Sequence, residues 1–319
     1  MIEFQELINF IRKEVNKSLG KIPIPKTPAY LYDPIRYSIK GSGKRFRPIL
    51  VHLVGRAHNL DPNIIMNISL SIELLHNFTL IHDDIMDKDT MRHGQKTIHA
   101  KWDKSAAILA GDGIFVLSQI ILSSIPKNSN EIFSHFNKAT LEICEGQALD
   151  KEFENNNKIK EEQYLDMIDK KTGALLSISS TLGPIYNGVD HNLIKYYNNF
   201  GRSLGKGFQL HDDLLEITSN QKKMGKTLGS DLAEGKQTMM VIKARNSFPN
   251  EWNDIIEKSN ETELISNCKK FFIEKGILEK TRLLAESYFN DARDNLKNIK
   301  NINTDELFKF IDLLEKRTF

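Results

Sequence analysis

The chain has 319 residues, of which 40% are hydrophobic and 27% charged, and its formal net charge is +2. This composition is typical of a soluble globular protein with enough apolar mass for a large core. The small net charge, with no basic stripe interleaved with aromatic residues, argues against a nucleic-acid-binding protein. Two distant cysteines, Cys144 and Cys268, exclude a disulfide framework and a cysteine-based zinc site, and they are compatible with a cytoplasmic protein.

The N-terminal segment has helical periodicity, with apolar residues at Phe4, Leu7, Ile8, Ile11 and Val15. Glutamates interrupt it early, so it does not resemble a signal peptide. Prolines then make an extended connection through "KIPIPKTPAY", and the loop "GSGKRFRP" opens the next segment, with Pro48 well suited to a helix start.

Long helical runs follow over residues 62–88, 104–125, 131–154, 161–182, 191–218 and, with breaks, 261–317. Within the second run, the stretch Ala106–Ile125 is the most apolar of the chain. It contains Asp112 and Gln119, which favour a buried core helix over a transmembrane segment. Residues 155–158 and 219–237 are predicted surface loops, and strand patterns are nearly absent. With no linker dividing the chain, we expect one all-α domain over residues 1–319.

One acidic signature occurs twice, as "IHDDIMD" at Ile81–Asp87 and as "LHDDLLE" at Leu210–Glu216. Its first and last acids are four residues apart, so they share one face of a helix. Like charges at this spacing repel inside an apolar helix and require positive partners. A solvated acidic face answered by lysines could explain a single copy, but the repetition favours a function.

Carboxylate oxygens are ligands that suit hard cations such as Mg²⁺ rather than zinc or copper. Neither signature has the alternating acids and glycine of an EF-hand. Because Mg²⁺ takes a few carboxylates and leaves its other positions to water and phosphate oxygens, two facing acidic helices predict a diphosphate site. Cations that match phosphate flank both signatures, in "GSGKRFRP" and "DKKTG" and at Lys44, Arg45, Arg47, Arg92, Lys171, Lys226 and Lys236.

These motifs together resemble the trans-isoprenyl diphosphate synthases, which include the farnesyl and geranylgeranyl diphosphate synthases. The likeness covers residues 30–245 in the order "GKRFRP", "ELLHNFTLIHDDIMD", "MRHG", "KTG", "GFQLHDDLLE", "MGKTLGSD" and "EGKQT". It implies a bundle of about ten core helices around a deep central cavity, usually in a homodimer. It also implies a prenyltransferase that extends an allylic diphosphate (dimethylallyl, geranyl or farnesyl) with isopentenyl diphosphate.

The resemblance further implies the roles of individual residues. It assigns direct Mg²⁺ binding to Asp83, Asp87 and Asp212, with support from Asp84, Asp213 and Glu216. About three Mg²⁺ ions are expected, and Mn²⁺ is expected to substitute. It assigns the allylic diphosphate to Arg92, Lys171 and Lys226, and isopentenyl diphosphate to Lys44, Arg47 and His76. It places Thr172 and Gln209 near the developing carbocation and Lys236 in a closing loop.

Two positions depart from the family pattern. His93 stands where the family usually has a second arginine that helps to hold isopentenyl diphosphate. Since a histidine loses its charge near neutrality, one hypothesis is that this substrate binds more weakly as the pH rises above 7. The alternative is neutral drift, with Lys44 and Arg47 holding the substrate. Glu216 replaces the usual aspartate and keeps its charge.

Product length should depend on the residues below Asp83. Thr79 and Phe78 lie four and five positions earlier, about 6–8 Å deeper along a helix, and Leu75 lies eight positions earlier. One aromatic with a small neighbour resembles the geranylgeranyl type, with a farnesyl product as the alternative. Phe78 could equally be ordinary core packing.

Three other functions use parts of the same pattern. A class I terpene cyclase or head-to-head condensing enzyme has similar acidic helices but lacks the second diphosphate pocket that "GKRFRP" resembles. A regulatory subunit of a heteromeric synthase tends to lose an acidic motif, and this chain keeps both. A simple divalent-cation-binding protein would bind Mg²⁺ without diphosphate.

Overall fold

The computed structural model describes residues 2–41, 43–92, 94–218 and 235–317. The predicted all-α architecture is confirmed, with one two-residue hairpin in the described part. The elements are α1 (Ile2–Leu19), α2 (Ala29–Ile39), α3 (Phe46–Ala57), α4 (Pro62–Met86), β1 (Met91–Arg92), β2 (Gln95–Lys96), α5 (Ile98–Lys101), α6 (Lys104–Ser123), α7 (Ser129–Phe153), α8 (Glu161–Ile168), the π-helix η1 (Asp169–Gly173), α9 (Ala174–Tyr186), α10 (His191–Thr218), α13 (Met239–Ser247), α14 (Pro249–Lys258), α15 (Glu261–Glu274), α16 (Ile277–Lys297) and α17 (Asp305–Glu315).

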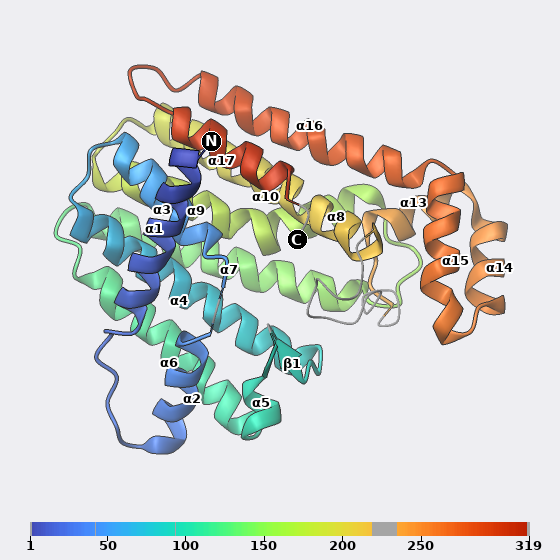
Figure 1. Cartoon of the computed structure of the whole chain (residues 1–319), viewed down its shortest axis with the longest axis horizontal. Helices are drawn as coiled ribbons and strands as arrows, with labels where there is room; N and C mark the ends of the chain where they lie inside the picture. Colours follow the sequence, from blue (N-terminus) through green and yellow to red (C-terminus); the bar gives the residue numbers. More distant parts are fainter. Residues whose placement is uncertain (1, 42, 93, 219–234, 318–319) are drawn as a thin grey trace.

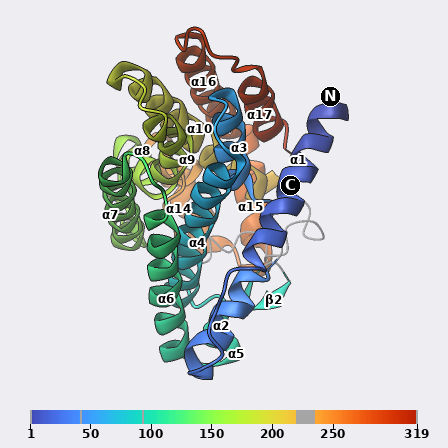
Figure 2. The same cartoon turned by 90° about the vertical axis from the view of Figure 1, so that its left-hand side faces the viewer.

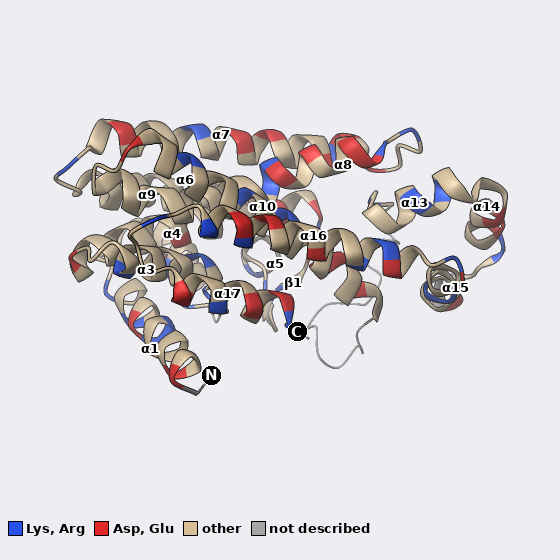
Figure 3. Cartoon of the chain, turned by 90° about the horizontal axis from the view of Figure 1, so that it is seen from above, with Lys and Arg blue, Asp and Glu red and all other residues tan. Residues whose placement is uncertain are grey.

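Helix α9 lies at the centre of the bundle. It packs against α3, α7 and α10, with α4 and α6 forming the next layer and α16 lying along α10 (Figures 1 and 2). No charged residue occurs in α9, which is tan throughout in Figure 3, and its residues 174–185 are all buried. Helices α13, α14 and α15 form one end of the molecule (Figure 1), where they share a small apolar core with the end of α10 and the start of α16.

The long helices begin and end close to where apolar periodicity predicts them. Helix α10 spans the predicted residues 191–218. Helices α4 and α6 begin where predicted and end two residues early, and α7 begins two residues early and ends one residue early. Side-chain caps explain two of the starts, because Asp61 accepts from Asn63 N at 2.7 Å and Asp103 accepts from Ala106 N at 2.9 Å. The β1–β2 hairpin was not predicted, since two-residue strands leave no periodic pattern.

Helix α6 differs from its prediction as a buried core helix. Only 39% of its most apolar window is buried, against 61% for α4. By length and composition these two helices could each cross a membrane, a test that core helices of soluble proteins also pass. The outer face of α6 exposes large apolar side chains, namely Ile108, Leu109, Val116 and Ile120. The prediction was wrong for this face, because apolar composition does not tell whether a helix is covered by its own chain.

Candidate active site

A cavity of about 780 Å³ lies among α4, α7, η1 and α10. It is lined by residues of both acidic signatures together with cations and apolar side chains. Fifteen of the residues predicted for the site line it: Lys44, Arg47, His76, Phe78, Thr79, Asp83, Asp84, Asp87, Arg92, Lys171, Thr172, Gln209, Asp212, Asp213 and Lys236. Segments more than a hundred residues apart in sequence thus meet at one hollow.

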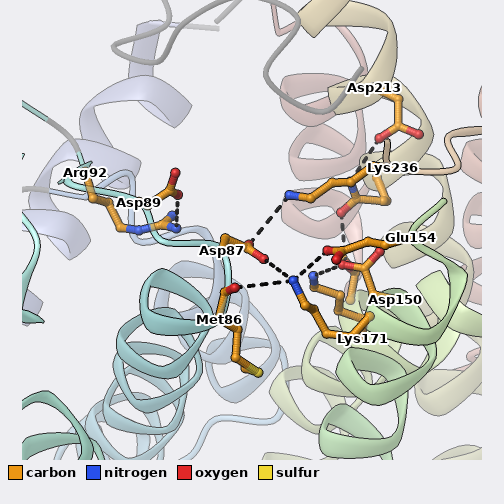
Figure 4. Close-up of polar contacts among 12 residues, drawn as sticks. Met86, Asp87, Asp89, Arg92, Asp150, Glu154, Lys171, Asp213 and Lys236 are labelled. Atoms are coloured by element: carbon orange, nitrogen blue, oxygen red, sulfur yellow. Dashed lines mark hydrogen bonds and ion pairs between the residues drawn. The ribbon is translucent and has the colours of Figure 1, made fainter. Parts of the chain in front are cut away.

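Asp87, the last acid of the first signature, is held between two lysines at the end of α4. Its carboxylate lies 3.3 Å from Lys151 Nζ and 3.6 Å from Lys236 Nζ (Figure 4). Lys151, on α7, also contacts the carbonyl of Met86 and the carboxylate of Glu154. The positive partners that like charges require are therefore supplied by α7 and by the segment before α13.

The second aspartate of each signature is buried and bound to protein groups. Asp84 is 5% exposed and accepts from Arg92 Nε at 2.5 Å. Asp213 is also 5% exposed, and it accepts from Tyr164 Oη and, at 3.1 Å, from Gln209 Nε2. These two carboxylates are tied into the walls, whereas Asp83 and Asp212 are half-buried at the cavity.

Asp83 lies in a dense set of charges. Burial raises the pKa of its carboxyl group, Lys171 and Arg92 lower it, and Asp87 and Asp150 raise it. Lys171 Nζ donates to Asp150 at 2.6 Å. Burial alone would lower the pKa of Lys171, but Asp150 and Asp83 more than offset this, so the lysine stays charged. The charged ammonium group of Lys171 is thus held in the cavity near the first acidic signature, that of α4.

Lys171 and Thr172 reach the cavity from the π-turn η1, which interrupts the helix formed by α8 and α9. Ala174 N donates to Asp169 O, five residues earlier, which marks one extra residue in the turn. Room for the bulge comes from Gly146, where a Cβ would lie 2.3 Å from Lys171 N, and from Gly205, where it would lie 2.5 Å from Gly173 Cα. Such bulges are frequent at functional sites.

A separate group of cations lines the cavity near the start of α3. Arg47 donates to His76 Nε2 at 3.0 Å, which makes this ring nitrogen an acceptor. Burial lowers the pKa of Arg47 to about 10. Partial burial, Arg317 and Arg12 lower the pKa of Lys44 to about 8. Closely spaced cations with lowered pKa values favour an anionic ligand.

Arg317, near the chain end, was not predicted to belong to the site. It forms an ion pair with Asp212, and its guanidinium carbon lies 4.5 Å from the ring centroid of Phe208. Its carbonyl accepts from His211 Nε2 at 2.8 Å. No sequence pattern indicates this contact, because it depends on how α17 packs against α10.

Two of the predicted residues that the structure describes are not on the wall of this cavity. Leu75 is fully buried in the core, and Glu216 is half-buried on α10. His93 and Lys226 lie outside the described residues. Conversely, Gln147 and Asp150 line the cavity without having been predicted. Their three-residue spacing, continued by Lys151 and Glu154, is a polar stripe on α7 that could have indicated them.

The donor chemistry fits Mg²⁺ held jointly with a phosphate. No group of three or more histidine, cysteine or acidic side chains converges on one point within the described ranges. A protein-only metal cage is therefore a poor fit here. Mg²⁺ instead commonly uses one or two carboxylates plus substrate phosphate oxygens, and Asp83, Asp87 and Asp212 on the walls offer that arrangement.

Comparisons with known proteins agree with this geometry. Residues 28–272 match the polyprenyl synthetase family. A geranylgeranyl pyrophosphate synthase of Geoglobus acetivorans is 38% identical over 302 residues, covering 92% of each chain. A geranylfarnesyl diphosphate synthase of Natronomonas pharaonis is 34% identical over 255 residues, covering 74% of each chain. A crystal structure of a geranylgeranyl pyrophosphate synthase superposes with a TM-score of 0.89 at 31% identity over 98% of each chain.

This all-α fold around an acidic, cation-lined cavity is that of the isoprenoid synthases. The chain belongs to the polyprenyl synthetase family, whose members use divalent metal.

Proposed function

We propose that the protein is a Mg²⁺-dependent trans-prenyltransferase that condenses isopentenyl diphosphate with allylic diphosphates and releases geranylgeranyl diphosphate. The observation that carries this is one cavity whose wall combines the acids of both signatures, several cations and apolar residues. Its relatives at 38% and 34% identity are named for products of this class. Residues 1–319 would act as one domain, since α1 and α16 pack on the matched region.

The first group of proposed roles concerns the metal and the allylic diphosphate. Bound Mg²⁺ would supply charge that stabilises the departing diphosphate. Asp83, Asp87 and Asp212 would hold it, with Asp84, Asp213 and Glu216 keeping those carboxylates in place. Arg92, Lys171 and Lys226 would grip the allylic diphosphate, and Lys236 would close over it.

The second substrate would bind at the other group of cations. Lys44, Arg47 and His76 would hold the diphosphate of isopentenyl diphosphate, with His93 contributing to its binding. Thr172 donates to Gln209 Oε1 at 3.0 Å, and these two joined side chains would lie near the developing carbocation. The double bond then attacks the allylic carbon as its C–O bond breaks, and a proton leaves to the released diphosphate. The apolar wall excludes water that would capture the cation.

The ring of Phe78 would stop the growing chain at the length of geranylgeranyl diphosphate. Its ring lies 5.3 Å from that of Phe115 and 4.8 Å from that of His82, measured between centroids. This aromatic stack extends from α4 to α6 below Thr79, and Leu75 lies one turn deeper. A farnesyl product remains the alternative that a tighter block would give.

We also propose a homodimer. The exposed face of α6, together with Leu141 of α7, is a contiguous candidate for self-association, since Gln119 of α6 donates to Asn137 of α7 at 2.5 Å and joins the two helices. We assign the protein to the cytoplasm, where its two free thiols would stay reduced.

One incubation tests the reaction. Purified protein with Mg²⁺, labelled isopentenyl diphosphate and each allylic primer should give labelled geranylgeranyl diphosphate on product chromatography. Chelation of the metal should abolish it, and Mn²⁺ should restore part of it. Consumption of an allylic diphosphate without label incorporation would indicate a cyclase or head-to-head enzyme instead. Heat of Mg²⁺ binding with no turnover of any primer would indicate a cation-binding protein or a regulatory subunit.

A further inference from the structure

Arg45 lies between two cations assigned to substrate, yet all of its guanidinium nitrogens have protein partners. It is 8% exposed. Nη1 pairs with Glu73 of α4, Nη2 donates to Gly41 O at 2.5 Å, and Nε donates to Asn16 Oδ1 of α1 at 2.9 Å. A phosphate could reach this guanidinium only by displacing a buried ion pair. Arg45 therefore has another role than its neighbours Lys44 and Arg47.

The backbone at Arg45 has an unusual conformation. Its φ is 54°, in the left-handed region that side chains other than glycine rarely adopt. The residue caps the start of α3, where its carbonyl accepts from Ile49 N at 3.0 Å. A Cβ added at Gly43 would lie 3.2 Å from Arg45 Nη1, so the side chain runs directly beneath the backbone that leads to Lys44. The side-chain contacts offset the cost of the strained turn.

Glu73 connects this support to the other side of the pocket. It is 2% exposed, and it lies three residues before His76, on the same face of α4. Burial raises the pKa of Glu73, while Arg45 and Arg47 lower it. One buried carboxylate thus serves as counter-charge for two arginines. On the outer side, Arg12 donates to Lys44 O at 3.2 Å.

We propose that Arg45, through its ion pair with Glu73, is a positioning residue that holds Lys44 and Arg47 at the spacing that binds isopentenyl diphosphate. The inference rests on the proposed function. It predicts that a change at Arg45 weakens the binding of isopentenyl diphosphate but not that of the allylic diphosphate. The cations proposed for the allylic diphosphate, Arg92 and Lys171, come from β1 and η1 and do not depend on Arg45.

The test is Arg45→Lys, which keeps the positive charge but lacks the guanidinium group that joins Asn16, Gly41 and Glu73. Isopentenyl diphosphate alone does not react, so its affinity can be measured by calorimetry without turnover. We expect its Kd to rise about tenfold, the equivalent of one or two lost hydrogen bonds. The Kd of an unreactive thiolo analogue of farnesyl diphosphate should stay within about twofold. In turnover, KM for isopentenyl diphosphate should rise while kcat is retained.

A second variant guards against misfolding. Arg45→Met removes the guanidinium and leaves Glu73 with Arg47 as its counter-charge, so no buried charge is left alone, and the variant should fold and still bind isopentenyl diphosphate weakly. Arg36→Lys is the matched control, because Arg36 also joins a carboxylate, Asp33, to a loop carbonyl, that of Pro25, away from the cavity wall. It should leave both affinities unchanged.

The outcomes separate the two proposals. Equal weakening of both ligands, or parent-like isopentenyl diphosphate affinity in folded Arg45→Met, would overturn the positioning role. Failure of the unsubstituted protein to bind isopentenyl diphosphate would overturn the proposed function itself, and the positioning role with it.

Discussion

The lowered pKa of Lys44 predicts a distinctive pH profile. Partial burial and the nearby charges of Arg317 and Arg12 bring this pKa from 10.5 to about 8. In the proposed function, isopentenyl diphosphate binds to the ammonium form of Lys44, and a bound diphosphate favours that form. The value of kcat/KM for this substrate reports the free enzyme, so it should fall as the pH passes 8.

The size of the effect follows from the titration of one group. With a pKa of about 8, roughly one tenth of Lys44 is charged at pH 9, and kcat/KM for isopentenyl diphosphate should be about tenfold below its plateau. With the ordinary value of 10.5, the loss at that pH would be only about 3%. At saturating substrate kcat should change little, because the bound anion restores the proton.

Initial rates measured from pH 6 to 10 with each substrate varied in turn provide the assay. Lys44→Arg should abolish the inflexion, since a guanidinium stays charged over this range. His93→Arg should remove any inflexion near neutrality and leave the one near pH 8. A flat profile for the parent up to pH 10, or the same inflexion in Lys44→Arg, would show that Lys44 does not titrate as the structure indicates.

Four further predictions concern other parts of the molecule. Phe78→Ala should lengthen the product by at least one isoprenoid unit on chromatography, because it opens the aromatic stack. Gly146→Ala should lower the free energy of unfolding by about 1–3 kcal/mol, and kcat with it, because its Cβ would displace the backbone of Lys171. Gln147→Leu should raise the free energy of unfolding by about 1 kcal/mol and lower kcat, because neither buried amide atom of Gln147 has a hydrogen-bond partner among the described residues, and a substrate would supply one. Ile120→Glu should yield monomers in light scattering.

Matched variants make these results interpretable. Phe10→Ala removes an exposed ring and should leave product length unchanged. Gly20→Ala adds a Cβ at 3.6 Å from its nearest neighbours and should be tolerated. Ile273→Glu alters an equally exposed apolar residue on α15 and should not affect association. Unaltered chain length in Phe78→Ala would remove the proposed role of that ring, and a Gln147→Leu protein with parent-like melting and turnover would do the same for the amide.

Local patterns predicted most of the fold and much of the cavity wall. Helix α10 was predicted in full because its apolar stripe, which includes Leu204 and Leu210, repeats at helical spacing over its whole length. The repeated acidic signature likewise predicted two walls, and Asp83 and Asp212 line the same cavity. In these cases the information lies within a few turns of one helix.

What the sequence did not predict depends on contacts between distant segments. The π-turn at Lys171 exists because Gly146 and Gly205, on two other helices, leave room for it. Arg317 reaches Asp212 only through the packing of α17. The exposed face of α6 could not be predicted either, because its covering would come from another molecule.

The π-turn also constrains how this chain can vary in length. Each residue of an α-helix turns the next by about 100°, and η1 holds one residue more than a regular turn. Deleting one residue between Asp169 and Gly173 would therefore leave a regular α-helix with α8 and α9 still in phase, but Lys171 would leave its partner Asp150. A surface loop such as residues 155–158 can change in length without such a loss, whereas the length of η1 decides which side chains the helix from Glu161 to Tyr186 turns into the cavity.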